Sequence, residues 1–408
     1  MKFISVLVAL TLSATMPTLA NDQTAADAPP SRSKQEILQS LAKRLNENGG
    51  GGIIMTEEER RVALANTHLM APVRTMAPSN NVYPLITDLS PEIADIEYVF
   101  EGETFTVGSF LKRHELMGFL VVEGDTIRLE HYASDHGSEV RWNTFSVSKS
   151  VTSMLIGAAI LDGYIDSVDQ TIDTYLPRMR GSHYGAITIH QALQMSSGIR
   201  WNEGYDDPDS DIANAALKGG VALTDYLITL PQLHEPGTKF NYNTAETNLL
   251  GEVLRSAIGN NATEYLNAKL WQPFGMEHEG NWALGAPFGR ETGGCCMNMT
   301  LRDYARVGLF AKHDGVLPSG QRILPEGWMT TSTTPSSAYP GYGYQWWLYE
   351  DGAYSASGLF GQAIFVKPNA DLVIAVHSNG PASSSTSIYG KHLYVVLQAL
   401  GKHYSTGR

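Results

Sequence analysis

The sequence is poor in cysteine, with only Cys295 and Cys296 among 408 residues, and these two are adjacent. A disulfide that closes a loop of chain is therefore excluded, so the fold must be stabilised by a hydrophobic core. Neighbouring cysteines fit relaxed disulfide geometry poorly, and we expect both to pack as small apolar residues in the turn after Gly293 and Gly294. The metal-binding spacings C-x-x-C and H-E-x-x-H are also missing. We expect no metal and no cofactor.

Positive charge is scarce as well. The chain has 29 Lys and Arg residues against 42 Asp and Glu residues, which gives a formal net charge of −13. Nucleic-acid binding needs a basic face that neutralises phosphates, so we expect no nucleic-acid partner. The hydrophobic content of 43% with 17% charged residues is typical of a globular protein.

Long apolar runs are absent too, and no stretch approaches the eighteen residues that would predict a membrane span. The run Phe3–Leu12 follows Lys2 and precedes Thr18 and Ala20, small residues at the −3 and −1 positions of a cleavage site. This pattern predicts a secretory signal peptide over residues 1–20, the alternative being a buried N-terminal helix. We therefore expect an exported protein, periplasmic or secreted. The sequence does not indicate an oligomeric state.

The mature chain divides into a leader with an N-terminal extension, residues 21–110, and one large domain, residues 111–408. Residues 21–32 are polar and rich in Pro and Ala, which is typical of a flexible leader. A helical period over residues 33–48 stops at Gly49–Gly52. Residues 53–110 show no strong period, and we expect an irregular extension there.

The large domain alternates between strand and helix patterns. Two β-branched runs flank Gly124-Asp125 and predict a hairpin with a two-residue turn. A helix capped by Asn143 or Thr144 should run through Leu161 and end at Gly163. Further helices are expected at 189–196, 210–229, 244–258, 262–271, 300–312 and 385–400, and strands within 342–349, 361–368 and 371–379. The order predicts an α+β fold, in which an antiparallel sheet is assembled from distant segments around an inserted all-helical lobe at about residues 165–300.

The spacing S-x-x-K carries the most chemistry, although it occurs three times. Ser31 lies in the leader, and Ser109 can simply cap a helix before the hairpin. Only Ser146 begins a long apolar helix, where side chains three residues apart share a face, so the Lys149 amine can reach the Ser146 hydroxyl. The helix N-terminus also offers free N–H groups to a developing oxyanion. The alternative is a serine-rich helix cap without catalytic function.

A lysine that accepts a proton must be neutral, whereas the pKa of free lysine is about 10.4. Burial or a second cation must lower the pKa of Lys149, or a tyrosine must share the proton transfer. Spacing cannot identify that third group among 19 tyrosines.

Five blocks occur in the order "FSVSKSVTSMLIG", "QALQMSSGIRWNE", "EPGTKFNYNTAETNLLGEVL", "MTLRDYARVGLF" and "YGYQWW…ASGLFGQAIFVKP". In this order they resemble the serine hydrolases of the class C β-lactamase and penicillin-binding-protein superfamily, and most of all its 6-aminohexanoate-dimer hydrolase (nylon-oligomer hydrolase) branch. The resemblance extends from about Met117 to the C-terminus. It implies the β-lactamase/transpeptidase-like fold, in which the active site lies between a helical lobe and an α/β lobe.

The resemblance also implies roles for individual residues. Ser146 matches the acylated nucleophile, Lys149 its proton acceptor, and Tyr242 the tyrosine that relays a proton to the leaving group. The backbone N–H groups of Ser146 and Leu359 match the oxyanion hole. Two residues after Tyr242 stands Thr244, where the β-lactamases commonly have Asn. A second Y-x-N, at Tyr265, lies within a predicted helix, and we expect it to serve packing.

A larger departure lies at Ala356-Ser357-Gly358. Here β-lactamases and penicillin-binding proteins carry K-T-G or H-T-G, whose cation meets the substrate carboxylate. Instead, Gly358, Gly361 and Gln362 match the G-x-x-G-Q of the aminohexanoate hydrolases and are expected to contact substrate. Losing the cation removes a contact of about 1.5–3 kcal/mol, which disfavours β-lactams.

Two aromatic residues are further candidates for substrate binding. Tyr205 lies in the acidic loop "WNEGYDDPDSD", which either faces the cleft or is a solvated loop held by Asp caps. We expect Trp346 to line the cleft together with Trp347, the alternative being a place in the core, where tryptophan more often lies. His190, His234 and His377 fit structural roles better, since no G-x-S-x-G motif accompanies them.

These observations predict an exported serine hydrolase that cleaves a linear amide or a carboxylic ester, a small-molecule substrate, through an acyl-enzyme on Ser146. Two alternatives stay open: a β-lactamase or D,D-peptidase, and a relative that binds peptidoglycan fragments or a partner without turnover.

Overall fold

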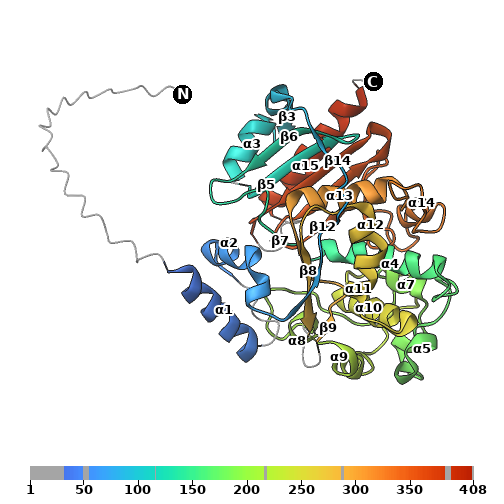
Figure 1. The fold of residues 1–408 in the computed structure, drawn as a ribbon. Helices are drawn as coiled ribbons and strands as arrows, with labels where there is room; N and C mark the ends of the chain where they lie inside the picture. Colours follow the sequence, from blue (N-terminus) through green and yellow to red (C-terminus); the bar gives the residue numbers. More distant parts are fainter. Residues whose placement is uncertain are drawn as a thin grey trace, which may run out of the picture. The chain divides into compact units, whose positions relative to one another are not determined.

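The computed structural model describes residues 32–48, 55–114, 116–215, 218–285, 289–381 and 387–406. The expected signal peptide, nearly all of the leader with Ser31, and Gly49–Gly52 lie outside these residues. The chain from Lys34 onward forms one compact unit (Figure 1).

A seven-stranded sheet forms one half of this unit, in the upper part of the view (Figure 1). In spatial order its strands are β11 (Trp347–Leu348), β12 (Tyr354–Ser357), β13 (Ala363–Lys367), β14 (Leu372–His377), β5 (Gly118–Glu123), β6 (Thr126–Tyr132) and β2 (Ile86–Thr87). Neighbours pair antiparallel except β2 and β6, which are parallel. Because β14 lies beside β5, the sheet joins distant segments, and the hairpin around Gly124-Asp125 is present, both as expected.

Alternating side chains of the sheet serve two cores. On one face, Phe119 and Val121 pack with α3 (Val107–His114) and α15 (Ile388–Thr406). On the other face, Leu120 and Val122 belong to the core that includes α4 (Val147–Leu161) and α13 (Leu301–Lys312). Successive side chains of a strand point to opposite faces of the sheet. Because β5 has apolar side chains on both faces, both faces must be covered. The sheet is therefore a buried layer between two layers of helices.

The longest helix, α15, covers one face of this sheet through Leu393, Val396 and Leu400, all of which are buried. Its other side carries polar residues such as Lys391 and Lys402. Among the helices that the structure describes, none combines the length and the apolar character that crossing a bilayer would require.

The inserted lobe contains helices in the expected regions, although the one expected at 210–229 is divided into two, and the lobe is not all-helical. Its helices are α5 (Ile172–Tyr175), α6 (His183–Ala186), α7 (Ile189–Leu193), α8 (Asp211–Ala215), α9 (Gly220–Leu227), α10 (Thr244–Ile258), α11 (Ala262–Leu266) and α12 (Gln272–Phe274). Its strands β8 (Gly280–Gly285), β9 (Arg290–Glu291) and β10 (Met297–Met299) form a second sheet with β1 (Val73–Met76) and β7 (Trp142–Asn143). The strands β9 and β10 are only two and three residues long, and β8 contains glycine at both ends and no β-branched residue, so none of them shows a clear strand pattern in the sequence.

The expectation of an irregular extension at residues 53–110 is wrong for the residues that are described. This stretch forms α2 (Glu57–Ala65), β1, β2, the hairpin of β3 (Glu97–Phe100) and β4 (Glu103–Thr106), and the start of α3. A capping box between Thr56 and Glu59 starts α2. The extension is built into both sheets, since β1 pairs with β8 and β2 with β6. Upstream, α1 (Lys34–Asn48) matches the helix expected at 33–48.

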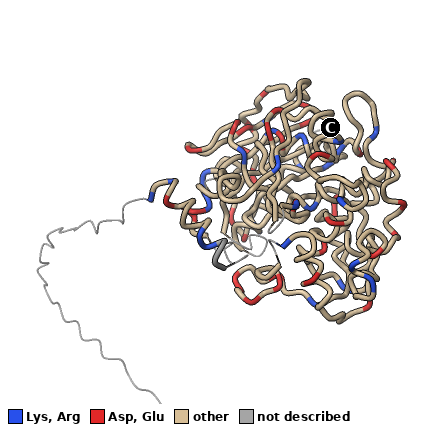
Figure 2. Tube along the Cα trace, turned by 60° about the horizontal axis from the view of Figure 1, so that its bottom comes forward, with Lys and Arg blue, Asp and Glu red and all other residues tan. Residues whose placement is uncertain are grey.

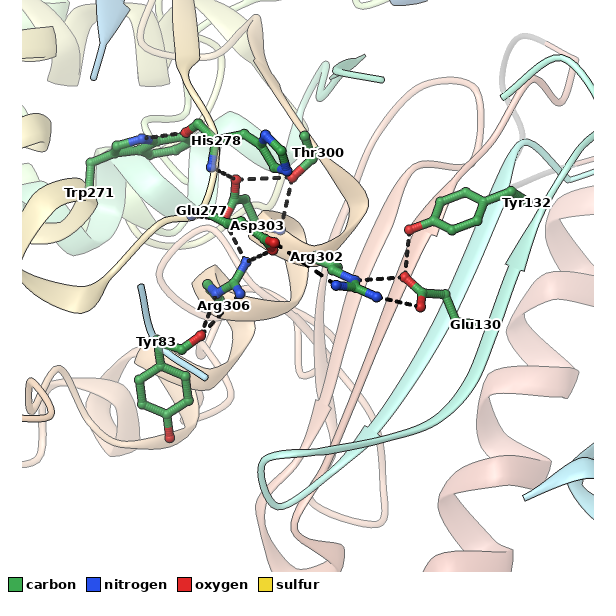
Figure 3. Close-up of polar contacts among 10 residues, drawn as sticks. All are labelled: Tyr83, Glu130, Tyr132, Trp271, Glu277, His278, Thr300, Arg302, Asp303 and Arg306. Atoms are coloured by element: carbon green, nitrogen blue, oxygen red, sulfur yellow. Dashed lines mark hydrogen bonds and ion pairs between the residues drawn. The ribbon is translucent and has the colours of Figure 1, made fainter. Parts of the chain in front are cut away.

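Charged residues of both signs are interspersed along the described trace (Figure 2), and several arginines are held by carboxylates. The clearest case is at α13, where Arg306 pairs with Asp303 and Glu277 while Arg302 pairs with Glu130 of β6 (Figure 3). Thr300 caps α13 and follows β10, which pairs with β7. The network thus fixes the strand pair that leads to the start of α4.

Candidate active site

The start of α4 holds Ser146 in a strained turn. The preceding residue, Phe145, has φ of +43°, a left-handed conformation that is costly for a bulky side chain. Asn143 stabilises this turn because its Oδ1 accepts from the Phe145 N–H at 2.8 Å. Ser146 occupies the N-cap position, yet its side chain makes no capping hydrogen bond. The hydroxyl is therefore available for chemistry, and the interpretation of Ser146 as a helix cap is not supported.

Lys149 lies one turn further on α4 and points its amine at Ser146. Its Nζ is 3.1 Å from Ser146 Oγ, 2.9 Å from Thr244 Oγ1 and 3.0 Å from the carbonyl oxygen of Gly294. The side chain is 1% exposed. Burial lowers the pKa of Lys149 to about 8, while the charge of Glu203 acts in the opposite direction. A substantial neutral fraction near neutral pH lets this amine accept a proton.

The other serines and the decoy motifs have structural partners. Ser148 Oγ bonds to Thr144 Oγ1 and accepts from the Met297 N–H, while Ser150 Oγ donates to the carbonyl oxygen of Gln345. Ser109 caps α3 together with Thr106, as expected. Tyr265 donates to Asp162 from α11, which agrees with its expected packing role.

Tyr242 directly precedes the N-cap of α10 and faces the same amine. Lys149 Nζ lies 5.3 Å from the centre of its ring. Burial raises the pKa of Tyr242, the charge of Glu203 raises it further, and a hydrogen bond with the Ser146 side chain lowers it. The ring stacks on Trp347 with centroids 5.7 Å apart. Tyr242 follows Lys149 by more than ninety positions in the sequence, and it forms one cluster with Ser146 and Lys149.

Glu203 and Thr244 complete this cluster, and the sequence did not identify Glu203 as a candidate. The Glu203 carboxylate accepts from Thr244 Oγ1 and from the Thr244 backbone N–H, the latter at 3.0 Å. Thr244 Oγ1 in turn receives a hydrogen bond from Lys149. Glu203 lies in a loop 41 positions before Thr244, and a single acidic residue there gives no local signal of this contact.

The carbonyl of Gly294 is a second feature that the sequence did not reveal. Gly293 and Gly294 run between α4 and α10, where a Cβ on Gly293 would lie 2.3 Å from the Thr247 carbonyl oxygen. The Gly294 N–H donates to Asn248 Oδ1 at 2.8 Å. These contacts hold the Gly294 carbonyl against Lys149, and the paired glycines are the only sequence signal for them.

The end of β12 approaches the start of α4 closely. A Cβ on Gly358 would lie 2.6 Å from the carbonyl oxygen of Thr144, so only glycine fits. Within the described residues, the backbone N–H groups of Leu359 and Ser146 have no hydrogen-bond acceptor. Both are therefore available to an oxyanion.

Gly361 and Gln362 brace this loop, and their expected contact with substrate stays a prediction. Gln362 is 0% exposed and its Oε1 accepts from the Phe360 N–H at 3.1 Å. Gly361 has φ of +89°, and a Cβ there would meet the Tyr389 ring. Both residues shape the turn that carries Leu359, because the side-chain amide and the left-handed glycine fix its backbone.

Of the two aromatic candidates, only Tyr205 lies at the site. It packs on the cluster that contains Leu359 and Phe360, and its hydroxyl donates to Glu203 at 2.8 Å. Trp346 is 0% exposed in the core, so its expected contact with substrate is wrong. Its neighbour Trp347 begins β11 and stacks on the ring of Tyr242.

The sulfur atoms of Cys295 and Cys296 lie against each other in the turn after Gly293 and Gly294. The pair directly follows Gly294, whose carbonyl contacts Lys149. His190 bonds to Tyr344 and His377 to His136, in agreement with structural roles. In the parts of the chain that the structure describes, no three His, Cys, Asp or Glu side chains are grouped to share a metal ion.

Comparison with known proteins shows the family to which this chain belongs. The Beta-lactamase family model matches residues 111–396. The 6-aminohexanoate-dimer hydrolase of Paenarthrobacter ureafaciens is 30% identical over 305 residues, which cover 68% of this chain and 76% of that protein.

Solved structures show the same fold. A Bacillus anthracis protein provisionally assigned as a 6-aminohexanoate-dimer hydrolase aligns with a TM-score of 0.72 at 21% identity, over 84% of this chain and 94% of that one. The penicillin-binding protein of Bacillus halodurans aligns with a TM-score of 0.57 at 18% identity, over 73% and 98%. The β-lactamase/transpeptidase-like α+β fold expected from the sequence is thus confirmed. The chain belongs to the Beta-lactamase family and is a hydrolase of the serine-hydrolase type, related to 6-aminohexanoate-dimer hydrolase.

Proposed function

We propose that this protein is an exported serine hydrolase that cleaves a linear amide or a carboxylic ester through an acyl-enzyme on Ser146. The observation that carries the proposal is the contact of 3.1 Å between Lys149 Nζ and Ser146 Oγ, made by a buried amine whose pKa is lowered to about 8. Such an amine can act as a base near neutral pH, whereas an exposed lysine cannot.

In the first step, Lys149 takes the proton of Ser146 while Oγ bonds to the acyl carbon. The carbonyl π electrons move to oxygen, and the N–H groups of Ser146 and Leu359 stabilise the oxyanion. When the tetrahedral intermediate collapses, the bond to the leaving group breaks, and Tyr242 delivers a proton to the departing amine or alcohol. Tyr242 suits this role because it hydrogen-bonds with Ser146 and lies beside the protonated Lys149.

Deacylation repeats the same chemistry with water as the nucleophile. Water loses a proton to the Lys149 and Tyr242 pair, attacks the ester carbonyl, and Ser146 leaves with its proton restored. Every proton transfer is served by groups of this cluster.

The substrate class follows from what borders the nucleophile. The relative from Paenarthrobacter ureafaciens carries the name of a linear amide hydrolase. At β12, Ala356-Ser357-Gly358 offers no cation for the carboxylate of a β-lactam. The Thr244 hydroxyl donates to Glu203 and so has no hydrogen for a substrate carbonyl. A linear amide or ester is therefore favoured over a β-lactam.

Export rests on the sequence pattern of residues 1–20. Expression with the native N-terminus in a Gram-negative host, followed by fractionation and intact-mass measurement, tests it. We expect a periplasmic or secreted product that begins at Asn21. A cytoplasmic product that retains Met1–Ala20 would contradict export.

The activity is tested with the mature protein and three acyl donors: p-nitrophenyl esters, the 6-aminohexanoate dimer and a fluorescent penicillin. We expect turnover of an ester or the dimer, and a transient mass increase on Ser146 that Ser146→Ala abolishes. Nitrocefin turnover or a stable penicillin adduct would instead identify a β-lactamase or D,D-peptidase. No turnover and no change of mass with any donor, with Ser146→Ala behaving like the wild type, would favour a binding protein without turnover.

A further inference from the structure

Four hydrogen bonds converge on the carboxylate of Glu203. Oε1 accepts from Thr244 Oγ1 and from the Tyr205 hydroxyl, and Oε2 accepts from the Thr244 backbone N–H and from Trp201 Nε1. An ionised carboxylate has about four lone-pair sites. All four acceptor positions of Glu203 are thus used inside the protein, and none is left for a substrate amine.

The bond from Thr244 fixes the direction of its hydroxyl. Thr244 Oγ1 has a single hydrogen, and Glu203 accepts it. Toward Lys149 Nζ, 2.9 Å away, the same oxygen can only accept. Without an acceptor at Glu203, the hydroxyl could rotate and direct its hydrogen at the amine.

This fixed direction determines how the neutral amine is oriented. A neutral lysine amine has two N–H donors and one lone pair, and three groups surround Lys149 Nζ. The carbonyl oxygen of Gly294 can only accept, and Thr244 Oγ1 can only accept while Glu203 holds its hydrogen. Both N–H donors are thereby used. The remaining partner, Ser146 Oγ, then faces the lone pair and donates its proton to it.

We propose that Glu203 is a positioning residue for the acylation step: through Thr244 it directs the Lys149 lone pair at Ser146 and compensates the ammonium that forms when the proton is transferred. This inference rests on the proposed function, since it assigns how the Ser146 and Lys149 pair is prepared for acylation. It also accounts for Thr244, because a hydroxyl can accept from Lys149 and donate to Glu203 at the same time.

The electrostatic surroundings agree with this role. The titratable groups that face Lys149 are Glu203, from the loop after α7, and Tyr242, before α10. Burial lowers the pKa of Lys149, and the charge of Glu203 opposes this effect. Glu203 thus favours the protonated amine that the acylation step produces, whereas burial favours the neutral amine that begins it.

Two measurements test the proposal in the full mature chain. The first is the rate at which a fluorophosphonate labels Ser146 between pH 5 and 10. The second needs no catalysis: the chemical shift of the Lys149 ε-carbon in protein labelled with [ε-13C]lysine, assigned with Lys149→Arg, is followed against pH. The variants are Glu203→Gln, Thr244→Val, the double variant, and Thr244→Ser, which keeps the hydroxyl. Asp206→Asn, an exposed residue of the same loop, is the matched control for charge.

We expect Glu203→Gln to slow labelling at least roughly tenfold at the pH optimum, a loss within the range of a general-base effect. The acidic limb of its pH profile and the Lys149 titration should both move to lower pH, because a negative charge that raises the pKa of Lys149 is gone. Thr244→Val should slow labelling similarly, and the double variant should lose little more, since both changes act through one hydroxyl. Thr244→Ser, which restores the hydroxyl, should recover most of the rate that Thr244→Val loses, and Asp206→Asn should resemble the wild type.

Failure of the inference differs from failure of the proposed function. If the wild type is labelled at Ser146 but Glu203→Gln leaves the rate, the acidic limb and the Lys149 titration unchanged, Glu203 is not a positioning residue. Fully additive losses in the double variant would also overturn the proposal. If the wild type is not labelled at all, the proposed function fails. The Lys149 titration tests the inference independently of labelling, because an unshifted titration in Glu203→Gln would show that Glu203 does not act on Lys149.

Discussion

Lys149 is nearly completely buried, and the three groups that contact its amine are two hydroxyls and one carbonyl. Burial in such neutral surroundings penalises the charged form and lowers the pKa to about 8. Below that pH the amine is protonated and has no lone pair for the Ser146 proton. The rate of acylation should therefore fall as the pH decreases below about 8, and kcat/KM for a p-nitrophenyl ester measured from pH 5 to 10 checks this. We expect Lys149→Met to lose the activity at every pH, and an acidic limb near pH 6 would contradict a lysine base.

Glu246, in the first turn of α10, is a buried carboxyl that should make the stability of the fold depend on pH. It accepts from Ser197 and from Asn243, and in the described structure its Oε2 has no hydrogen-bond partner. Burial raises the pKa of Glu246 to about 8. The folded state therefore retains a proton that the unfolded chain releases above about pH 4.5.

The stability contribution of the protonated Glu246 is fully present below the unfolded pKa and is lost as the pH rises toward 8. Between pH 5.5 and 7.5 the free energy of unfolding should fall by roughly 2 kcal/mol from this group alone. Glu246→Gln should remove that decrease, which urea unfolding of both proteins at the two pH values measures. An equal pH dependence in both proteins would show that Glu246 is ionised in the fold.

At the scale of elements, the contact between the end of β12 and the start of α4 sets the oxyanion site. Gly358→Ala would place a methyl group 2.6 Å from the Thr144 carbonyl oxygen and 2.7 Å from Gln362 Oε1, so the strand must move. Displacing the Leu359 N–H should reduce kcat by about 10²–10³-fold, as for the loss of one oxyanion donor. Gly137→Ala, where the added methyl group has no neighbour within 4 Å, is the matched control and should retain activity. A Gly358→Ala enzyme with normal kcat would exclude Leu359 as a donor.

Elements with a strong local pattern were predictable, and those that depend on distant partners were not. The hairpin of β5 and β6, the helix α4 and the pair Ser146 and Lys149 follow from turn chemistry, helical period and the i to i+3 spacing. The strands β9 and β10 are too short to show a period, and β8 has glycine at both ends and no β-branched residue. Glu203 reaches Thr244 only because the loop after α7 folds over the start of α10. Which of Trp346 and Trp347 is buried depends on the strand register, and two adjacent tryptophans in a sequence do not determine that register.

Across the whole molecule, the segment before the matched family region, residues 111–396, is integrated into the site that this region carries. Leu64 of α2 is buried in a cluster with Trp142, Leu359 and Phe360, and the Arg60 guanidinium lies 5.3 Å from the Phe360 ring centre. Arg60 also donates to Asn379, which follows β14. The extension therefore covers the loop that presents the Leu359 N–H.

This arrangement predicts that a substitution far from the nucleophile in sequence affects both stability and acylation. Leu64→Ala should lower the free energy of unfolding by about 2–5 kcal/mol, because it leaves a cavity beneath the loop. It should also slow labelling of Ser146, since Leu359 and Phe360 lose a packing partner. Leu69→Ala removes the same atoms from a side chain that is 60% exposed and should change neither quantity appreciably. Urea unfolding and fluorophosphonate labelling of both variants provide the measurement. If Leu64→Ala destabilises the fold but labels at the wild-type rate under native conditions, the extension stabilises the domain without shaping its oxyanion site.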